Sequence, residues 1–533
     1  MSTALLAGDR AVHETEAVDD GEHDGEHDGE HDGEHDDEPE GAHGAAHDDE
    51  NPFDAIIVGA GIAGITAAAL LNKAGRRVVV LEARDRVGGR TWTDHSAGFS
   101  VDRGASWIHG VDGNPLVPLV EALGVRTAEF TVGSFQAGGR PIADHDASGR
   151  LMDVAAQREW LDDIAAVDGA LLSTIAASQP GDTYGTVVGR AIAAVGLESP
   201  GGSSPGGDAS GADSADADAD ADSVASADAA SDRADRARSF HMHRVEEQCG
   251  AWIDQLDAHG LDDDVIIGDE VIFPDGYDVF ARTLARGLDV RLGQVVHEVE
   301  WVDTGVTVRT ADATFRAEQA IVTVPLGVLK AGTIRFEPAL PAPIADLVDR
   351  VGMGVFDKVF LQFPERFWEP DVYAIRLHGA GGWPWHSWYD VSVVSGTPML
   401  LTFAAGPWGR RVEEMGDAEI AASVLGALRT MYGDAVPDPT GSWITRWGQD
   451  PFALGSYSYL PVGVLNEERD GLAEPIGGVL HLAGEATWSE DAATVHGALL
   501  SGHRAAERVL GREIELDDLK EGAQRGTDRT GEA

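Results

Sequence analysis

One stretch, residues 54–93, constrains the fold more than any other part of the chain. An apolar run, Ala55–Val58, leads directly into Gly59-Ala60-Gly61-Ile62-Ala63-Gly64. A strand, a G-x-G-x-x-G turn and a helix form the pattern in which the turn is tight and the backbone approaches a pyrophosphate at the helix N-terminus. A second β-branched run, Val78–Leu81, ends at Glu82, where a carboxylate can accept hydrogen bonds from ribose hydroxyls. The stretch therefore predicts a Rossmann-type dinucleotide site.

The residues that follow Glu82 indicate which dinucleotide is bound. Ala83 and Arg84 are followed by Gly88-Gly89-Arg90, which places a second glycine turn and a second guanidinium group beside the same pyrophosphate. NAD leaves its site at every turnover and seldom needs a second clamp, whereas a permanently held FAD benefits from one. The pattern favours FAD.

The charge of the chain limits its partners. Its 533 residues include 92 acidic and 39 basic side chains, for a formal net charge of −53, and only four lysines. Without a basic stripe, we expect no nucleic-acid partner, and small cationic molecules suit the chain better. An acidic, lysine-poor surface stays hydrated in multi-molar salt, so we expect a protein of a salt-accumulating halophile.

Cysteine content and hydropathy bear on the compartment. Cys249 is the only cysteine, which allows no intrachain disulfide and fits a reducing compartment. The first residues lack the pattern of a signal peptide, and no apolar run is long enough to cross a membrane. We expect a cytoplasmic protein without a membrane partner. No pattern indicates an oligomeric state.

Low-complexity segments and periodicity suggest the domain plan. Gly-Glu-His-Asp repeats within residues 1–50 predict a disordered acidic tail, with weak divalent-metal binding as the alternative. Apolar spacing predicts helices over 151–177, 241–259, 417–431 and 495–510, and alternation predicts a β-meander over 290–324. The expected fold class is α/β: a Rossmann-type FAD-binding domain (51–135, 262–335 and 456–512) interleaved with an α+β substrate domain on a mixed sheet (136–261 and 336–455), with disordered segments at 198–239 and 513–533.

A C-terminal stretch repeats the logic of the phosphate site. An apolar strand, Val479–Ala483, leads into Gly484-Glu485, and the helix over 495–510 follows after a loop. Glu485 could accept hydrogen bonds from ribityl hydroxyls. Backbone amides near Thr494 and Val495 would form a positive helix end beneath a flavin, where they would stabilise its anionic reduced form.

Several independent motifs together resemble those of the flavin-containing amine oxidases. They are residues 59–90, the segment Gly104-Ala105-Ser106-Trp107-Ile108-His109-Gly110, Lys358, Trp447 with Gly455-Ser-Tyr457-Ser-Tyr459, and residues 484–502. The similarity is closest to polyamine (spermine) oxidases and lysine-specific demethylases, and it covers residues 51–512 without the insertion. It implies non-covalent FAD, because Gly455 stands where monoamine oxidases carry the cysteine that binds the flavin.

The resemblance and the glycine pattern together assign residues to the cofactor. Core packing alone is the alternative for Trp447. The predicted FAD-binding residues are Gly59, Gly61, Ile62, Ala63, Gly64, Glu82, Ala83, Arg84, Gly88, Gly89, Arg90, Gly104, Ala105, Ser106, Trp107, Val296, Trp447, Gly484, Glu485, Thr494 and Val495.

Three residues are the catalytic candidates. Lys358 lies in an alternating apolar segment, where burying a charged amine is costly. The resemblance implies that its amine holds a water molecule against flavin N5. The alternative is a lysine at a strand edge whose amine reaches solvent. The resemblance places His109 at the substrate and Tyr457 in an aromatic cage that orients the amine. The alternatives are a loop histidine and a cross-strand packing tyrosine. Thr494 replaces the second cage tyrosine of monoamine oxidases, which leaves the cage half open for longer amines.

The resemblance implies oxidation of a small-molecule amine, most specifically a polyamine. Hydride transfer to flavin N5 would give an imine, then an aldehyde and a shorter amine, and oxygen would be reduced to hydrogen peroxide. An L-amino-acid oxidase would need an arginine such as Arg366 or Arg376 in the pocket. The same motifs are also compatible with a monoamine oxidase, a carotenoid-type desaturase or a flavoprotein scaffold with structural FAD. No metal site is predicted.

Overall fold

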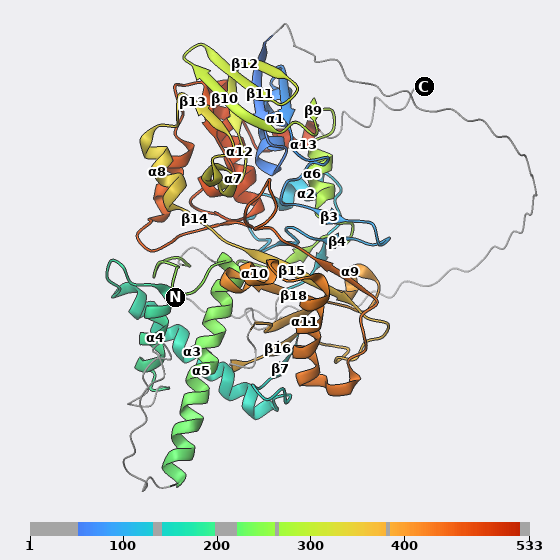
Figure 1. Cartoon of the computed structure of the whole chain (residues 1–533), viewed down its shortest axis with the longest axis vertical. Helices are drawn as coiled ribbons and strands as arrows, with labels where there is room; N and C mark the ends of the chain where they lie inside the picture. Colours follow the sequence, from blue (N-terminus) through green and yellow to red (C-terminus); the bar gives the residue numbers. More distant parts are fainter. Residues whose placement is uncertain (1–51, 132–140, 198–220, 262–265, 380–383, 523–533) are drawn as a thin grey trace, which may run out of the picture. The chain divides into compact units, whose positions relative to one another are not determined.

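The structure is a computed structural model that describes residues 52–131, 141–197, 221–261, 266–379 and 384–522, with side chains omitted for 221–231 and 521–522 (Figure 1). The chain divides into two compact units, Met1–Ala46 and His47–Ala533, and every described residue belongs to the second. The predicted tail at 1–50 lies outside the described residues. Among the residues that are described, no helix is long and apolar enough to cross a membrane.

An eight-stranded sheet collects strands from three separate parts of the chain. Its order is β13-β10-β11-β12-β1-β2-β9, with β21 paired to the last part of β12. Parallel pairing joins β1 to β2 and β12, and β12 to β21, whereas β10, β11 and β12 form the predicted antiparallel meander. The strands are β1 Phe53–Val58, β2 Val78–Leu81, β9 Val290–Arg291, β10 Val296–Val302, β11 Gly305–Thr310, β12 Thr314–Val322, β13 Arg335–Glu337 and β21 Leu480–Leu482.

Two helices pack closely together against this sheet. They are α1 (Ile62–Lys73) and α12 (Val495–Leu510), whose apolar residues share one buried cluster with β1 and β2. A Cβ at Gly502 would lie 2.2 Å from the carbonyl oxygen of Ala63, so the two backbones touch. The short helix α13 (Asp518–Gly522) adds a contact through Asp518, which binds Lys73 at 2.9 Å. The prediction of disorder from residue 513 is therefore wrong up to residue 522, because this segment is anchored on α1.

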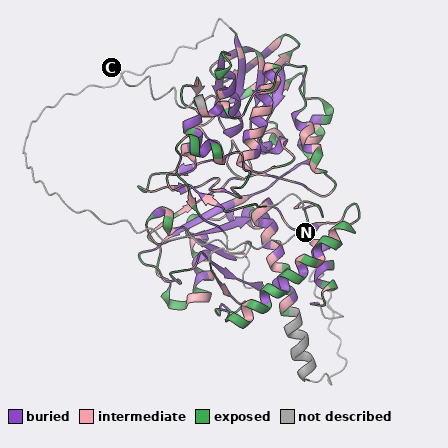
Figure 2. Cartoon of the chain, turned by 180° about the vertical axis from the view of Figure 1, so that it is seen from behind, coloured by how far each residue is buried: buried purple, intermediate pink, exposed green. Residues whose placement is uncertain are grey.

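A second, six-stranded sheet is mixed. Its order is β19-β15-β18-β17-β16-β7; β7 and β16 are parallel, and the other neighbours are antiparallel. The long helix α11 (Asp417–Tyr432), predicted at 417–431, shares a buried cluster with β15, and the strands of both sheets are mostly buried (Figure 2). The strands are β7 Ile142–His145, β15 Phe356–Gln362, β16 Ala374–Leu377, β17 Ser387–Asp390, β18 Met399–Ala405 and β19 Gly441–Ile444.

Three helices, α3 (Val154–Ala176), α4 (Tyr184–Ala194) and α5 (Ala221–Cys249), form a separate layer with its own buried cluster. The helix predicted over 241–259 ends at Cys249, because Gly250 adopts φ +58°. The disorder predicted over 198–239 is contradicted from Ala221 onward. The α5 residues Ala234 and Ala237 are buried, and Arg233 binds Asp163 of α3. Residues 198–220 lie outside the described part.

Short elements connect these layers. Two of them matter for the site: β4 (Val101–Asp102), which pairs with β3 (Thr93–Asp94), and β5 (Trp107–Ile108), which pairs with β8 (Val271–Ile272). The remaining helices and strands are α2 Val117–Ala122, β6 Ala128–Glu129, α6 Asp278–Leu284, α7 Leu326–Ala331, α8 Ala342–Arg350, β14 Gly352–Met353, α9 Ser392–Ser395, α10 Gly406–Glu413 and β20 Ser458–Tyr459.

The close contact between α1 and α12 predicts that adding one methyl group at residue 502 lowers the stability of the protein. Gly502→Ala forces two backbones apart, and we expect it to lower the free energy of unfolding by about 1–3 kcal/mol. Gly426→Ala in α11 is the matched control, because a Cβ there meets nothing within 4 Å. The control should stabilise the protein by up to about 1 kcal/mol through helix propensity. Denaturant unfolding at fixed salt measures both, and a Gly502→Ala variant as stable as the parent would contradict the close contact.

Candidate functional site

Two glycine turns meet at the carboxyl end of β1. Gly59 has φ +104°, and a Cβ at Gly64 would lie 2.0 Å from the carbonyl oxygen of Gly59, so both positions require glycine. The second turn lies against the first, since Gly61 and Gly88 form a bridge and Gly89 approaches the Cα of Gly61. The two glycine turns therefore lie side by side, as the sequence predicts.

The start of α1 has the features that a pyrophosphate needs. A Cβ at Gly61 would meet nothing within 4 Å, whereas one at Gly59, Gly64 or Gly89 would meet neighbouring atoms at 3.2 Å or less. No side chain caps the helix at Gly61, so backbone N–H groups of its first turn remain available for an anion. The buried Ile62 and Ala63 follow at once. This cradle fits a dinucleotide phosphate.

Glu82 lies at the end of β2 beside the first glycine turn. Its side chain is buried and accepts hydrogen bonds from the backbone N–H groups of Ala60 at 2.6 Å and Arg84 at 2.9 Å. The segment that leads to β10 runs alongside, because the N–H of Gln294 donates to the carbonyl oxygen of Glu82 at 2.8 Å. Val296, the first residue of β10, is buried in the sheet cluster next to this segment.

The two predicted clamp arginines both bind carboxylates from the C-terminal part of the chain. Arg84 forms a bidentate pair with Asp450 at 2.7 and 2.8 Å. Arg90 donates to Glu485 at 2.9 Å and to the carbonyl oxygen of Ser456 at 2.9 Å. These pairs fix both guanidinium groups beside the glycine turns.

Glu485 organises the start of α12. One carboxylate oxygen pairs with Arg90, and the other accepts hydrogen bonds from the hydroxyl of Ser458 at 2.6 Å and the N–H of Ala493 at 3.0 Å. Burial raises the pKa of Glu485, but Arg90 and Ser458 outweigh burial and hold this pKa below the usual value. Ala493 adopts φ +66°, and Thr494 then caps α12 by accepting from the N–H of Gly497 at 2.9 Å.

The segment from Gly104 to Trp107 is fixed against the second glycine turn. A Cβ at Gly104 would lie 1.8 Å from the carbonyl oxygen of Arg90, and the N–H of Ala105 donates to the same oxygen at 3.0 Å. Trp447 lies next to this segment, and its indole N–H donates to the carbonyl oxygen of Arg103 at 3.1 Å. Trp447 is buried, and its ring also meets that of Trp92 edge to face.

Lys358 reaches this segment from the six-stranded sheet. Its buried amine donates to the carbonyl oxygens of Asp102 at 3.0 Å and Gly104 at 2.6 Å, and to the hydroxyl of Ser106. The amine also lies 5.3 Å from the centre of the Trp107 ring. Burial lowers the pKa of Lys358 to about 7, against the opposing charge of Asp102. At neutral pH this amine can therefore both hold and release a proton.

An aromatic wall connects the three catalytic candidates. His109 stacks on Trp107 at 6.1 Å, and its Nδ1 pairs with the buried carboxylate of Glu270. The wall continues from Trp107 through the rings of Phe403 and Phe356 to Tyr457, with centroid separations of 6.4, 4.5 and 5.7 Å. Apolar rings at this spacing exclude water from one side of the site.

Tyr457 is held by a residue that sequence reasoning missed. Its hydroxyl donates to the backbone carbonyl oxygen of Glu247 in α5 at 2.7 Å, and burial raises its pKa well above the usual value. The carboxylate of Glu247 pairs with His386 at 2.8 Å and accepts from the hydroxyl of Tyr389 at 3.2 Å. Asp450, Glu247 and Glu270 carried no sequence signal, because each lies in a different segment from its partner.

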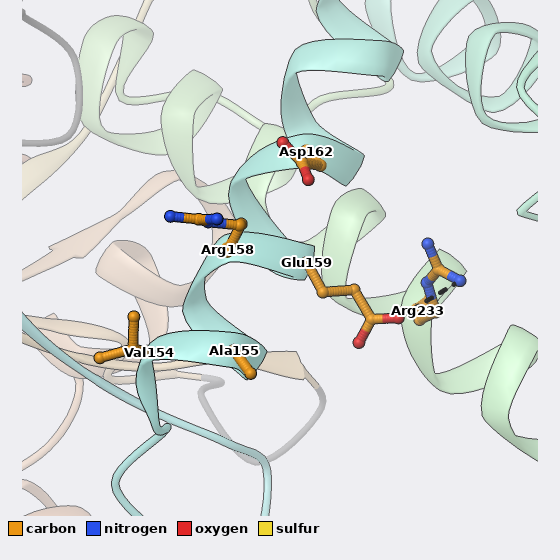
Figure 3. A pocket seen from close by; sticks show the side chains of 6 residues that line it. All are labelled: Val154, Ala155, Arg158, Glu159, Asp162 and Arg233. Atoms are coloured by element: carbon orange, nitrogen blue, oxygen red, sulfur yellow. Dashed lines mark ion pairs between the residues drawn. The ribbon is translucent and has the colours of Figure 1, made fainter.

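A further hollow lies on α3, away from these residues. Figure 3 shows it lined by side chains of α3 and by Arg233 of α5, which pairs with Glu159 at 3.5 Å. Both side chains of this pair are more than a third exposed, and the hollow contains no aromatic wall, glycine turn or buried titratable group. It has none of the features expected of a catalytic site.

Comparison with known proteins decides the family. The family model of flavin-containing amine oxidoreductases matches residues 62–510. The chain belongs to this family. Polyamine oxidase 4 of Oryza sativa is 33% identical over 87% of this chain and 89% of its own length, and polyamine oxidase 2 of Arabidopsis thaliana is 33% identical over 87% and 90%. Lysine-specific histone demethylase 2 of Homo sapiens is 30% identical over 85% of this chain but only 53% of its own length.

The fold has counterparts among solved structures. A structure of putrescine oxidase bound to putrescine matches with a TM-score of 0.65 at 21% identity, covering 87% of this chain and all of that one. This match confirms the predicted fold class, and the family model and the polyamine oxidase relatives confirm the resemblance and the enzyme class: this flavin amine oxidoreductase has the amine oxidase fold and uses FAD. The open cradle at Gly61 and the uncapped start of α1 fit that cofactor.

The Glu485 network predicts a pH-dependent loss of stability. Glu485→Gln breaks a buried ion pair and should lower the free energy of unfolding by about 3 kcal/mol at pH 7 and release FAD. The pKa of Glu485 is lowered in the folded state, so its stabilisation is present above the ordinary carboxyl value of 4.5 and lost as the pH falls below it. The gap between variant and parent should narrow at low pH. Glu490→Gln is the control, because Glu490 is exposed. Equal FAD content in the parent and in both variants would contradict the assignment of Glu485 to the FAD site.

Proposed function

We propose that this enzyme oxidises a polyamine at a carbon–nitrogen bond. One observation carries the proposal: the buried amine of Lys358 is bonded to the 102–106 segment, directly before the Trp107–His109 face of an aromatic wall that also includes Tyr457. The relatives named polyamine oxidases, at 33% identity, support the same substrate class.

Each candidate residue has a distinct task in this proposal. Tyr457 and the aromatic wall pack against the carbon chain of the neutral amine and keep water away. Lys358 moves a proton at its amine nitrogen near neutral pH, and His109, fixed by Glu270, positions the substrate nitrogen. Bound FAD would supply the two-electron oxidation of the substrate carbon. The imine is then hydrolysed to an aldehyde and a shorter amine, while oxygen accepts the electrons.

The arrangement of arginines speaks against amino-acid oxidation. A substrate carboxylate would need a guanidinium group whose charge is not already balanced. Arg366 is paired with Asp390, and Arg376 is buried beside Glu247, whose pKa it helps to lower against burial. Arg366 therefore has a carboxylate partner, and the charge of Arg376 acts on the carboxylate of Glu247.

The substrate class is tested by flavin bleaching without oxygen. Spermidine or spermine, mixed anaerobically with the oxidised enzyme, should reduce the flavin within seconds, and phenylalanine should not. The absorbance near the flavin maximum records this, and hydrogen peroxide after admission of air confirms turnover. Bleaching by phenylalanine alone would assign an amino-acid oxidase, and no bleaching by any amine would remove the proposal.

Lys358 is tested by its removal. Lys358→Met keeps the length of the side chain and removes the titrating amine, and we expect flavin reduction by spermidine to slow about 10²- to 10⁴-fold. Because the pKa of Lys358 is about 7, the parent rate should rise with pH through 7, and the variant should lack this rise. Lys330→Met is the control, since Lys330 instead binds backbone carbonyl oxygens between Val348 and Val351. An unchanged pH profile in Lys358→Met would exclude the role.

The acidic surface leads to a separate proposal about salt. We propose that the net charge of −53 suits a cytoplasm rich in potassium chloride. The Debye length falls from about 10 Å at 0.1 M to about 3 Å at 1 M, so like charges repel strongly only in dilute salt. The midpoint of thermal unfolding should therefore rise steeply between 0.1 and 3 M KCl. An unchanged midpoint would rule out the adaptation.

A further inference from the structure

Two buried carboxyl groups lie in hydrogen-bonding contact behind Lys358. Asp357, the residue before Lys358 in β15, is fully buried, and Glu413, the last residue of α10, is 7% exposed. Successive side chains of a strand point to opposite faces of its sheet. The two carboxyl groups, called the acid pair below, therefore lie on the other face of β15 from the Lys358 amine.

The acid pair binds two consecutive backbone amides. Asp357 Oδ1 accepts hydrogen bonds from the N–H of Trp447 at 2.9 Å and the hydroxyl of Thr445 at 2.8 Å. Glu413 Oε1 accepts from the N–H of the next residue, Gly448. A Cβ at Gly448 would lie 2.5 Å from Glu413 Oε2, so the approach is close enough to require glycine. The acid pair thereby fixes the backbone of this segment.

The same segment is bonded to Lys358 and to the 102–106 segment. The N–H of Lys358 donates to the hydroxyl of Thr445 at 2.8 Å, and the N–H of Thr445 donates to the carbonyl oxygen of Lys358 at 3.0 Å. The indole of Trp447 reaches the carbonyl oxygen of Arg103. A displacement of the acid pair would therefore shift both Lys358 and the ring of Trp447.

The cationic side chains around the acid pair bind other acceptors. Within the described ranges, neither carboxyl group forms an ion pair. The amine of Lys358 points to the 102–106 segment, and Tyr457, whose pKa burial and nearby acids raise, is neutral. The arginines of the adjoining segments are Arg103, paired with Asp94, Arg410, bonded to the carbonyl oxygen of Met353, Arg411, paired with Glu414, and Arg446, paired with Asp417.

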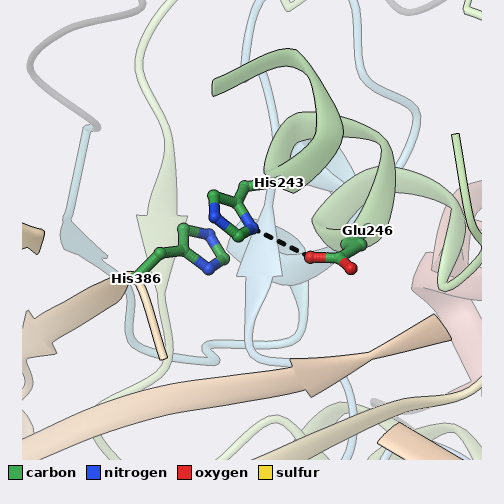
Figure 4. Close-up of side chains that lie close together, drawn as sticks. All are labelled: His243, Glu246 and His386. Carbon is green, nitrogen blue, oxygen red and sulfur yellow. Dashed lines mark hydrogen bonds and ion pairs between the residues drawn. The ribbon is translucent and has the colours of Figure 1, made fainter. Parts of the chain in front are cut away.

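Other buried carboxylates of the chain have a nitrogen donor on a side chain. Figure 4 shows Glu246 beside His243, whose ring nitrogen pairs with it at 2.9 Å. Glu485 likewise pairs with Arg90 at 2.9 Å. The acid pair has no such partner among the described residues, and its donors are backbone amides and one hydroxyl.

A proton supplies the donor that the acid pair lacks. Asp357 Oδ2 is buried and meets no N–H or O–H donor of the described residues. Two buried carboxylates in contact repel each other when both are ionised, so one of them keeps its proton. Burial, together with the charge of Glu413, raises the pKa of Asp357 to about 8. At pH 7 Asp357 is a neutral acid, and its O–H can donate to the carboxylate of Glu413.

We propose that Asp357 and Glu413 are positioning residues that share one proton, and that this proton keeps residues 445–448 where they fix Lys358 and Trp447. The effect on flavin reduction rests on the proposed function, whereas the shared proton does not depend on which amine is oxidised. Loss of the proton leaves two adjacent carboxylates, whose repulsion separates α10 from β15 and sets an alkaline limit to the reaction.

Infrared spectroscopy of the parent holoenzyme detects the proton directly and does not depend on any variant folding. With ¹³C-labelled aspartate, the C=O band of one protonated aspartic acid should be present at pH 7 and fall to half near pH 8. Asp102, whose pKa burial raises to about 6, is mostly ionised before this range begins. The band should be missing from Asp357→Asn. Its absence from the parent at pH 7 would overturn the proposal.

The pH profile of flavin reduction tests the positioning role. With spermidine and without oxygen, the parent rate should fall about 10-fold for each pH unit above 8. Asp357→Asn should not show this fall, because its amide gives Glu413 a permanent donor and keeps the acceptor for Thr445 and Trp447. Asp371→Asn, at an exposed position, should fall as the parent does. An alkaline fall in Asp357→Asn equal to that of the parent would refute the role.

Rescue by the conservative variant separates positioning from bulk stability. Asp357→Ala removes the acceptor for Thr445 and Trp447, and flavin reduction at pH 7 should slow about 10- to 100-fold. Asp357→Asn should recover most of this loss. An alanine variant that is folded and as fast as the asparagine variant would show that the acid pair positions nothing.

Thermal unfolding gives a second readout of the proton. The pKa of Asp357 is raised from 3.8 to about 8 by folding, so its stabilisation is complete below pH 3.8 and is lost as the pH rises to about 8. At fixed salt, the midpoint of Asp357→Asn should therefore increase relative to the parent between pH 5 and 8, and then stay level. A difference that does not change with pH would contradict a shared proton.

The outcomes separate the acid pair from the reaction. If the protonated aspartic acid is found and no amine bleaches the oxidised flavin, the shared proton stands and the proposed oxidation fails. If amines bleach the flavin but no aspartic acid is protonated at pH 7, the oxidation stands and the shared proton is refuted.

Discussion

The hydrogen bonds of Lys358 are the constraint on which the candidate site depends. A single amine from β15 of the six-stranded sheet bonds to three acceptors in residues 102–106, which are continuous with the glycine-rich part of the other sheet. Burying an amine is costly unless its donors are satisfied, so the 102–106 segment has one favourable position relative to β15. Trp107 and His109 follow this segment directly in the chain, so fixing the segment also fixes where these two residues lie relative to β15.

The cofactor side depends on pairs formed across the length of the chain. Arg84 and Asp450 are 366 positions apart, and Arg90 and Glu485 are 395 apart. These pairs bind the glycine turns, the loop before β20 and the start of α12 into one unit. Glu485 makes the most contacts in this unit, because it also accepts hydrogen bonds from the hydroxyl of Ser458 and from the N–H of Ala493, whose φ is positive. Assembly of the cofactor cradle therefore requires that the first and last segments fold together.

Sequence reasoning succeeded where local chemistry decides the structure. The glycines at 59 and 64, the strand at 78–81 and the helix at 495–510 follow from turn geometry and apolar periodicity, which operate over a few residues. It failed at long-range partners such as Glu247, because which carboxylate meets Tyr457 depends on how α5 packs. It also failed at α5 itself. A segment rich in alanine and aspartate has low apolar content, but Arg233 and the buried Ala234 and Ala237 anchor it to its neighbours.

The scarcity of lysine makes the protonation state of the Lys358 amine directly measurable. The chain has four lysines, so NMR of the holoenzyme with isotope-labelled lysine gives four side-chain signals, and Lys358→Met identifies the one of interest. We predict that the Lys358 signal titrates near pH 7, as burial against the 102–106 segment requires. A Lys358 signal that titrates near the ordinary lysine value of 10.5 would contradict this role, because the amine would then be fully charged at neutral pH and unable to accept a proton.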